Sequence, residues 1–132
     1  MTAATALVLD CEGLSRLINR DPDLTAWLLA AEAEDAQVVT STATLVEARN
    51  PKVPQARFDY AISRLHVVPV DEALARSASK LLAVAGLHGH KYALDAILSA
   101  TALQLPGRTA ILTSDPEDIS TLCGPRVRVI KL

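Results

Sequence analysis

Short apolar runs alternate with longer amphipathic stretches along the chain. The runs are rich in Val, Leu and Ile and are short enough to be buried strands. In the stretches between them, apolar residues recur every three or four positions, as they do on one face of a helix. The predicted strands cover residues 6–9, 37–40, 67–70, 109–113 and 127–130.

Two helices are predicted after each of the first three strands, and one helix after the fourth. Residues that cap or break helices mark their ends, among them Asp21-Pro22, Asp71 and Gly86. The stretch 87–91 is predicted to be a loop, which puts Asp95 in the first turn of the next helix. Glu47 falls about two turns into the helix after the second strand.

This order of elements implies crossover connections between neighbouring strands. It predicts an α/β fold of three α/β/α layers, with a mostly parallel central sheet of four to five strands. No linker, repeat or low-complexity segment interrupts the pattern, so residues 1–132 are predicted to form a single domain.

Composition and charge narrow the possible functions. The formal net charge of −2 gives no overall attraction for nucleic acid, which leaves only local basic patches for that role. No stretch approaches the ~18 apolar residues of a membrane span, and no signal peptide is expected. The two cysteines, Cys11 and Cys123, are expected to be free thiols in a reducing cytoplasm. We therefore expect a cytoplasmic protein.

Four acidic residues stand near the joints between strands and helices: Asp10, Glu47, Asp95 and Asp115. The ends of central parallel strands and the helices beside them meet at one crevice, so we expect these carboxylates to gather there. Buried carboxylates repel one another, and a cation would compensate them. Their hard oxygen atoms favour Mg2+ or Mn2+, since the sequence has no Cys/His spacing typical of zinc sites. Such sites commonly hydrolyse phosphate esters.

Each acid also has a structural interpretation. Asp95, Asp115 and Asp118 are compatible with simple helix N-termini, where a negative side chain contributes ~0.3 to 1 kcal/mol. Glu47 is compatible with a solvated helix face. The combination of four acids in this order, rather than any one of them, favours a site.

The segments that carry these acids resemble the successive motifs of PIN-domain ribonucleases, and within that family the VapC toxins of bacterial toxin–antitoxin pairs. The segments are Leu7-Val8-Leu9-Asp10, Thr44-Leu45-Val46-Glu47, Leu94-Asp95-Ala96-Ile97-Leu98-Ser99-Ala100-Thr101-Ala102 and Ile111-Leu112-Thr113-Ser114-Asp115. They span nearly the whole chain in the family's order, and the last two are the more specific.

The resemblance implies a PIN-like fold and a Mg2+- or Mn2+-dependent endoribonuclease, the toxin of a type II toxin–antitoxin system. It also implies a homodimer that cleaves RNA and is inhibited by a cognate antitoxin protein, a segment of which fills the active-site groove. The catalytic metal ligands that it assigns are Asp10, Glu47, Asp95 and Asp115.

Three further residues are candidates for the same site. Thr113 matches a hydroxyl residue that typically supports it, and Asp118 is an additional acid near the same edge. Glu12 departs from the pattern, since many relatives carry a small hydroxyl residue at that position. Three roles stay open for Glu12: it replaces that hydrogen bond, adds an acid to the metal shell, or points elsewhere.

A locally basic region offers candidates for contact with RNA. It contains Arg49, Lys52, Arg57 and Arg64, with Phe58 and Tyr60 interleaved. One interpretation is an RNA-binding rim with rings for base stacking. The other is an amphipathic helix whose aromatic residues lie in the core or at a dimer contact. Lys91, one helical turn before Asp95, is a separate candidate for a phosphate contact, and His88-Gly89-His90 is either an RNA contact or a solvated loop.

Two other functions stay open. The segment Asp10-Cys11-Glu12-Gly13-Leu14 faintly resembles the nucleophile loop of haloacid-dehalogenase-type phosphatases, although Glu12 stands where that family needs a second Asp. The other alternative is a PIN-like module that binds RNA or an antitoxin without catalytic turnover.

Overall fold

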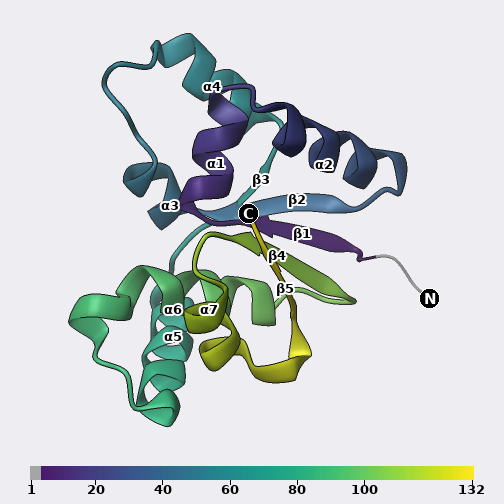
Figure 1. Cartoon of the computed structure of the whole chain (residues 1–132). Helices are drawn as coiled ribbons and strands as arrows, with labels where there is room; N and C mark the ends of the chain where they lie inside the picture. Colours follow the sequence, from purple (N-terminus) through teal and green to yellow (C-terminus); the bar gives the residue numbers. More distant parts are fainter. Residues whose placement is uncertain (1–3) are drawn as a thin grey trace.

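A computed structural model describes residues 4–132 as a five-stranded sheet with helices on both faces (Figure 1). The elements are β1 (Ala6–Leu9), α1 (Cys11–Ile18), α2 (Pro22–Ala33), β2 (Gln37–Ser41), α3 (Thr42–Glu47), α4 (Gln55–Ser63), β3 (His66–Val68), α5 (Glu72–Ala85), α6 (Gly89–Leu103), β4 (Thr109–Thr113), α7 (Pro116–Cys123), the 3-10 turn η1 (Gly124–Arg126) and β5 (Arg128–Lys131). All the strands pair in parallel, in the order β3-β2-β1-β4-β5. The predicted three-layer α/β/α fold is confirmed.

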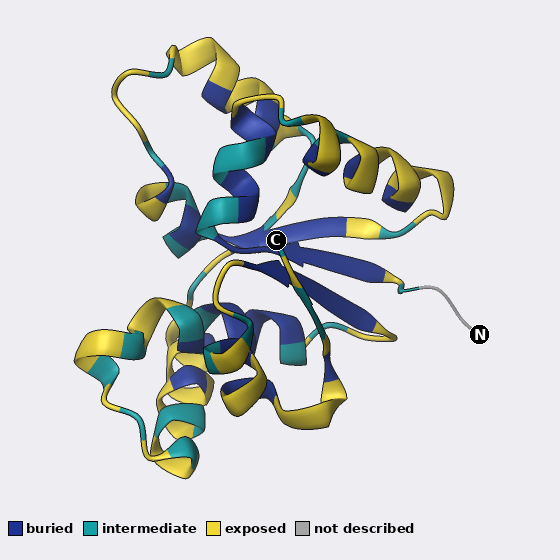
Figure 2. Ribbon diagram, in the orientation of Figure 1, coloured by how far each residue is buried: buried dark blue, intermediate teal, exposed yellow. Residues whose placement is uncertain are grey.

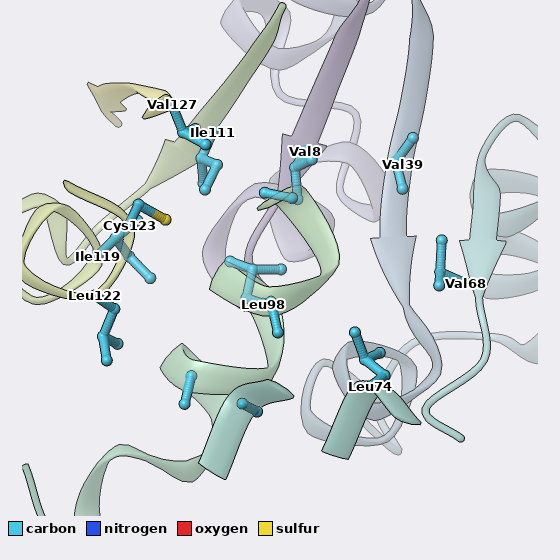
Figure 3. Packing of buried hydrophobic residues seen from close by; sticks show 14 of the residues in the cluster. Val8, Val39, Val68, Leu74, Leu98, Ile111, Ile119, Leu122, Cys123 and Val127 are labelled. Carbon is cyan, nitrogen blue, oxygen red and sulfur yellow. The ribbon is translucent and has the colours of Figure 1, made fainter. Parts of the chain in front are cut away.

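The sheet separates two hydrophobic cores. Figure 1 shows α1, α2 and α4 on one side of the sheet and α5, α6 and α7 on the other. Val8 of β1 packs with Val39 and Ile111 against α5, α6 and α7 (Figure 3), whereas Leu7 and Leu9 pack against α1, α2 and α4. Alternate residues of a strand point to opposite faces, so one continuous apolar run serves both cores. The central strands β1, β2 and β4 are therefore mostly buried, while the outer helix faces are exposed (Figure 2).

Helix boundaries follow from side chains that satisfy backbone groups. Asp21, Ser41 and Asp71 each accept a hydrogen bond from a backbone N–H in the first turn of the helix that follows. Gly86 ends α5 in the left-handed conformation, with φ of 69°, which glycine adopts without a steric penalty.

Two predicted boundaries are wrong. Strand β3 ends at Val68, before Pro69, and the N–H of Val70 donates instead to Thr42 Oγ1 at 3.1 Å. Helix α6 begins at Gly89, within the predicted loop, because Nδ1 of His88 accepts a hydrogen bond from the N–H of His90 and caps the helix. Asp95 therefore lies in the second turn of α6, not the first.

The structure bears on the expectations about the cysteines and about membrane-spanning segments. Cys11 and Cys123 are both free thiols, as predicted. Among residues 4–132, no helix is both long enough and apolar enough to cross a bilayer.

Candidate active site

The four predicted acids, Asp10, Glu47, Asp95 and Asp115, line one pocket of about 210 Å3 at the carboxyl edge of the sheet. They come from four parts of the chain. Asp10 follows β1 directly, Asp115 follows β4 after one residue, Glu47 is the last residue of α3, and Asp95 projects from α6. The central position of β1, between β2 and β4, brings three of these parts to one place.

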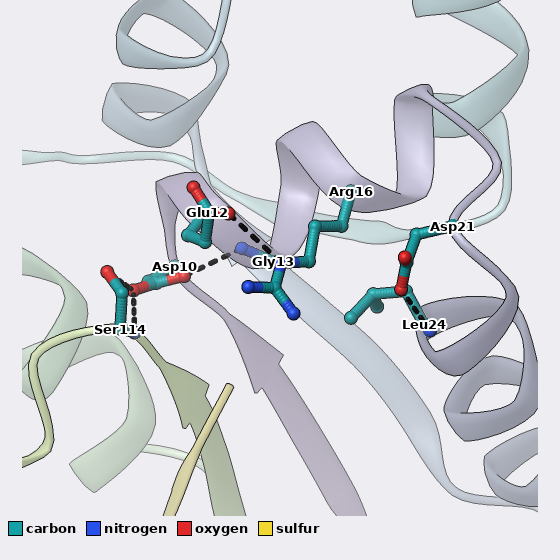
Figure 4. Close-up of polar contacts among 7 residues, drawn as sticks. All are labelled: Asp10, Glu12, Gly13, Arg16, Asp21, Leu24 and Ser114. Carbon is teal, nitrogen blue, oxygen red and sulfur yellow. Dashed lines mark hydrogen bonds and ion pairs between the residues drawn. The ribbon is translucent and has the colours of Figure 1, made fainter.

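Asp10 is held in one orientation by both of its oxygen atoms. Oδ1 accepts a hydrogen bond from the N–H of Gly13 at 2.8 Å, which caps α1. Oδ2 accepts from the N–H of Ser114 at 2.9 Å and from its hydroxyl at 3.4 Å (Figure 4). The residue is only 9% exposed. Backbone N–H donors and the positive end of the α1 dipole stabilise its negative charge.

Thr113 and Asp115 form the joint between β4 and α7. Thr113 is fully buried, and its Oγ1 accepts a hydrogen bond from the N–H of Asp115 at 2.9 Å. Asp115 occupies the N-cap position of α7, but its side chain makes no capping hydrogen bond. Asp115 lines the acidic pocket, and its carboxylate has no capping role in the helix.

Glu47 and Asp95 carry the electrostatic strain of the site. Partial burial raises the pKa of Glu47, and repulsion by Asp10 and Asp115 raises it further. Burial also raises the pKa of Asp95 from 3.8 to about 6, and the negative charges of Asp115, Asp118, Glu47 and Asp10 add to that effect. Both groups hold a proton more tightly than a free carboxyl does, because the charged form is poorly solvated and repelled.

The position of Asp95 excludes the interpretation that it only stabilises a helix N-terminus. A carboxylate stabilises a helix through its dipole only within the first turn, and Asp95 lies in the second turn of α6. Asp118 does lie in the first turn of α7 and is not among the residues lining the pocket. It affects the site through its charge, as one of the groups that raise the pKa of Asp95.

Glu12 lines the pocket, yet its carboxylate is bound elsewhere. Its Oε1 accepts a hydrogen bond from Nε of Arg16, one turn along α1, at 3.0 Å (Figure 4). Of the three roles left open by the sequence, this contact matches the third, a side chain directed along the helix. It is a partly exposed pair within one helix, a type that contributes little to stability.

The donor set of the pocket fits a hard divalent cation by its chemistry. Each of the four acids supplies oxygen ligands, and none of them pairs with a Lys, Arg or His within the described part of the chain. No group of three or more His, Cys, Asp or Glu side chains within residues 4–132 is arranged to hold a metal ion as it stands.

Comparison with known proteins supports the fold. No protein-family model matches the sequence, and no curated protein matches it. One chain from the crystal structure of VapBC2 from Rickettsia felis, bound to a DNA fragment from their promoter, superposes with a TM-score of 0.67. The match covers 96% of this chain and 98% of that chain, at 16% sequence identity. This protein shares its fold with a VapBC chain. The PIN-like fold implied by the sequence resemblance is thereby confirmed.

Three basic candidates predicted from the sequence differ in their surroundings. Arg49 donates to the carbonyl oxygens of Asn50 and Val53, and its guanidinium lies 4.9 Å from the centre of the Phe58 ring. It thus braces the loop between α3 and α4. Lys52 is exposed in that loop, and Lys91 is exposed on α6 with Nζ 5.2 Å from the centre of the Tyr92 ring.

The aromatic residues of the basic region divide between its two interpretations. Phe58 is buried in the core beneath α4, as the amphipathic-helix interpretation predicted. Tyr60 is 63% exposed, so its ring faces are available at the surface.

Sequence reasoning gave no role to two side chains that shape the pocket. Ser114 joins Asp10 to the β4–α7 joint, although only its place between Thr113 and Asp115 hinted at a role. Cys11 lines the pocket beside the acids. Burial raises the pKa of its thiol, and the negative charge of Glu47 adds to this, so the thiol stays protonated.

Proposed function

We propose that this protein is a Mg2+- or Mn2+-dependent endoribonuclease that acts as the toxin of a toxin–antitoxin pair. The observation that carries the proposal is the convergence of Asp10, Glu47, Asp95 and Asp115 on one pocket without a basic partner among the described residues. The fold shared with a VapBC chain supports it.

The proposed activity assigns different tasks to the acids. Asp10 is the fixed ligand, because two backbone N–H groups hold its carboxylate in place. Asp115 is positioned by Thr113 through its backbone. Glu47 and Asp95, whose pKa values are raised by burial and by the neighbouring carboxylates, are the groups whose negative charge a cation would compensate most.

The cation would supply the chemistry that the side chains lack. When bound, it lowers the pKa of a water molecule and neutralises charge on the phosphodiester. The acids hold and orient this ion, while the apolar side chains of Leu94 and Leu98 line the same pocket.

Replacing Asp10 tests the proposal. Asp10→Asn removes a ligand charge at nearly constant size, and the amide oxygen still accepts one of the two backbone hydrogen bonds. We expect the loss of at least 100-fold in the rate of Mn2+-dependent RNA cleavage, on the order of what one essential electrostatic group contributes, with a folded protein by circular dichroism. Glu72→Gln is the matched control, because Glu72 is exposed on α5 and, within residues 4–132, pairs only with Arg76.

The results separate the proposal from its alternatives. Full metal-dependent cleavage by Asp10→Asn would contradict the assignment. A wild-type protein that binds Mn2+ and RNA but cleaves no RNA would instead be a binding module. A phosphorylated Asp10, trapped with a phosphate ester, would indicate a phosphatase of the haloacid-dehalogenase type.

The proposed biological role includes two protein partners. We propose a cognate antitoxin that inhibits the nuclease, since the similar structure is of a VapBC complex, and a second copy of this chain in a homodimer. Co-expression with the protein encoded by an adjacent reading frame tests the first partner, by rescue of growth and co-purification. Light scattering of the purified protein tests the second.

A further inference from the structure

Three arginine side chains surround a small surface cavity at the end of α1 that is remote from the acidic pocket. The cavity of about 50 Å3 lies between α1, α2 and α4, with Arg20, Arg57, Arg64 and Tyr60 among its lining residues. Buried Leu17 and Ile18 form part of its wall. Figure 1 shows α4 close to the far end of α1, away from the strand ends.

The charge at this cavity is mostly uncompensated. Only Arg64 has an acidic partner in the described residues, with its guanidinium 3.2 Å from Glu32. Arg20 and Arg57 are exposed and have no ion pair within residues 4–132. Three guanidinium groups with one carboxylate attract an anion, and their planar donor groups match the oxygen atoms of a phosphate.

The backbone of Arg20 adds an independent observation. Arg20 follows the C-cap of α1 with φ of 60°, in the left-handed region, where the N–H of Asp21 donates to the carbonyl oxygen of Arg16 at 2.9 Å. This is the helix-ending position that glycine normally occupies, because a Cβ atom is strained there. An arginine at this position gives up stability, which is expected where the side chain has a function.

The arrangement favours RNA over a protein segment as the ligand. The cavity has room for a few water molecules but not for a large apolar side chain, which would anchor a peptide. The exposed ring of Tyr60 beside the arginines offers the stacking face that single-stranded RNA uses. Helix α1, with eight residues, spans about 12 Å, so a strand of a few nucleotides reaches from this cavity to Asp10.

We propose that Arg20, Arg57 and Arg64, with Tyr60, form a phosphate-binding subsite for the RNA strand whose scissile bond enters the acidic pocket. The subsite rests on the proposed ribonuclease function. It supplies the attraction for RNA that the net charge of −2 does not provide. The carboxylates of the acidic pocket repel the phosphates of the substrate. The arginines would offset this repulsion by binding a phosphate of the same strand a few nucleotides away from the scissile bond.

RNA binding in EDTA tests the subsite separately from cleavage. The probe is a fluorescein-labelled single-stranded RNA of about 12 nucleotides, within the usual range of single-strand site sizes, and anisotropy is measured over a series of salt concentrations. We expect Arg57→Gln to weaken binding several-fold for any sequence and to lower the slope of log K against log salt by about 0.7. Tyr60→Ala should weaken binding and leave the slope unchanged. Arg76→Gln, on exposed α5, is the matched control and should change neither.

Arg20→Gly distinguishes a binding role from a structural one. Because glycine relieves the backbone strain, this variant should keep or raise the melting temperature while it loses affinity and salt slope as Arg57→Gln does. Unchanged affinity and slope in both variants would overturn the subsite, as would an acidic peptide that binds at the arginines while RNA binding survives their replacement. If wild-type protein cleaves no RNA but Arg57→Gln still lowers affinity and slope, the ribonuclease proposal fails and the binding subsite stands.

Discussion

At Asp95, burial and the neighbouring carboxylates hold the pKa at about 6 instead of the usual 3.8. The folded protein therefore binds this proton more tightly than the unfolded chain does. Protonated Asp95 therefore contributes to stability. This contribution is fully present below about pH 3.8, and it is lost as the pH rises through about 6. The ionised form of Asp95 is thus destabilising at neutral pH, as expected for a carboxylate placed for function and not for packing.

Asp95→Asn should stabilise the protein at neutral pH. The full shift corresponds to roughly 3 kcal/mol, but the side chain is only half-buried, so solvent screening reduces the expected gain in the free energy of unfolding to about 1 kcal/mol at pH 7.5. The gain should shrink as the pH falls through 6 and vanish near pH 4. Urea unfolding in EDTA at several pH values measures it.

A nearby acid provides the control for that measurement. Glu117 is exposed in the first turn of α7 and does not line the acidic pocket. Glu117→Gln removes the same charge but also a favourable interaction with the helix dipole, so it should give no gain. Equal stability of wild type and Asp95→Asn at every pH would show that the repulsion at Asp95 is absent.

At the scale of elements, the joints after β1 and β4 build the rigid half of the pocket. Because β1 and β4 are paired, the N–H of Ser114 meets Oδ2 of Asp10. The hydroxyl of Thr113 shapes the second joint from within. The other half consists of Glu47, at the exposed end of the short helix α3, and Asp95 on α6.

Thr113→Val tests whether the joint positions Asp115. Valine has nearly the same shape but leaves the N–H of Asp115 without its acceptor, at a cost of about 1 kcal/mol. Because the carboxylate of Asp115 would then be displaced, the variant should cleave RNA more slowly and bind Mn2+ more weakly, as measured by calorimetry. Both effects should persist under conditions in which the variant is fully folded, so that the loss of stability does not account for them.

Thr101→Val is the control for the joint. Thr101 is also fully buried, but its hydroxyl donates to the carbonyl oxygen of Ile97 within α6, and this oxygen keeps its helical partner after the substitution. Wild-type Mn2+ affinity and activity in Thr113→Val would show that Asp115 needs no such support.

The sequence could predict the elements and the acids because both depend on local patterns. Apolar periodicity locates the strands, and carboxylates at their ends are visible in the chain itself. The Ser114–Asp10 contact was not predictable, because it joins residues 104 positions apart and depends on β1 pairing with β4. The start of α6 was missed because a histidine side chain, an uncommon cap, begins it. The role of Arg49 within its loop likewise depends on how that loop folds back.

At the scale of the whole molecule, a single sheet contributes side chains to both hydrophobic cores, and the acidic pocket lies at the carboxyl edge of that sheet. Residues of β1 alternate between the core under α5, α6 and α7 and the core under α1, α2 and α4. Neither helical layer can keep its buried surface if the sheet is lost. The four acids, which come from both sides of this sheet and from its edge, therefore depend on a single cooperative unit.

Truncation in one core should accordingly destabilise both. Ile119 and Leu14 are fully buried on opposite faces of the sheet, and Ile119→Ala or Leu14→Ala should each lower the free energy of unfolding by about 2 to 5 kcal/mol. Trp27, the single tryptophan, lies on α2 and reports on one layer only, whereas far-ultraviolet circular dichroism reports on all helices. In Ile119→Ala, which alters the other layer, both signals should shift to the same lower urea midpoint.

Val84→Ala is the control for these truncations. At a site 81% exposed, it should change the free energy of unfolding by less than about 0.5 kcal/mol. Separate midpoints for the two signals in Ile119→Ala would show that the layers unfold independently, and the pocket could then be lost without global unfolding.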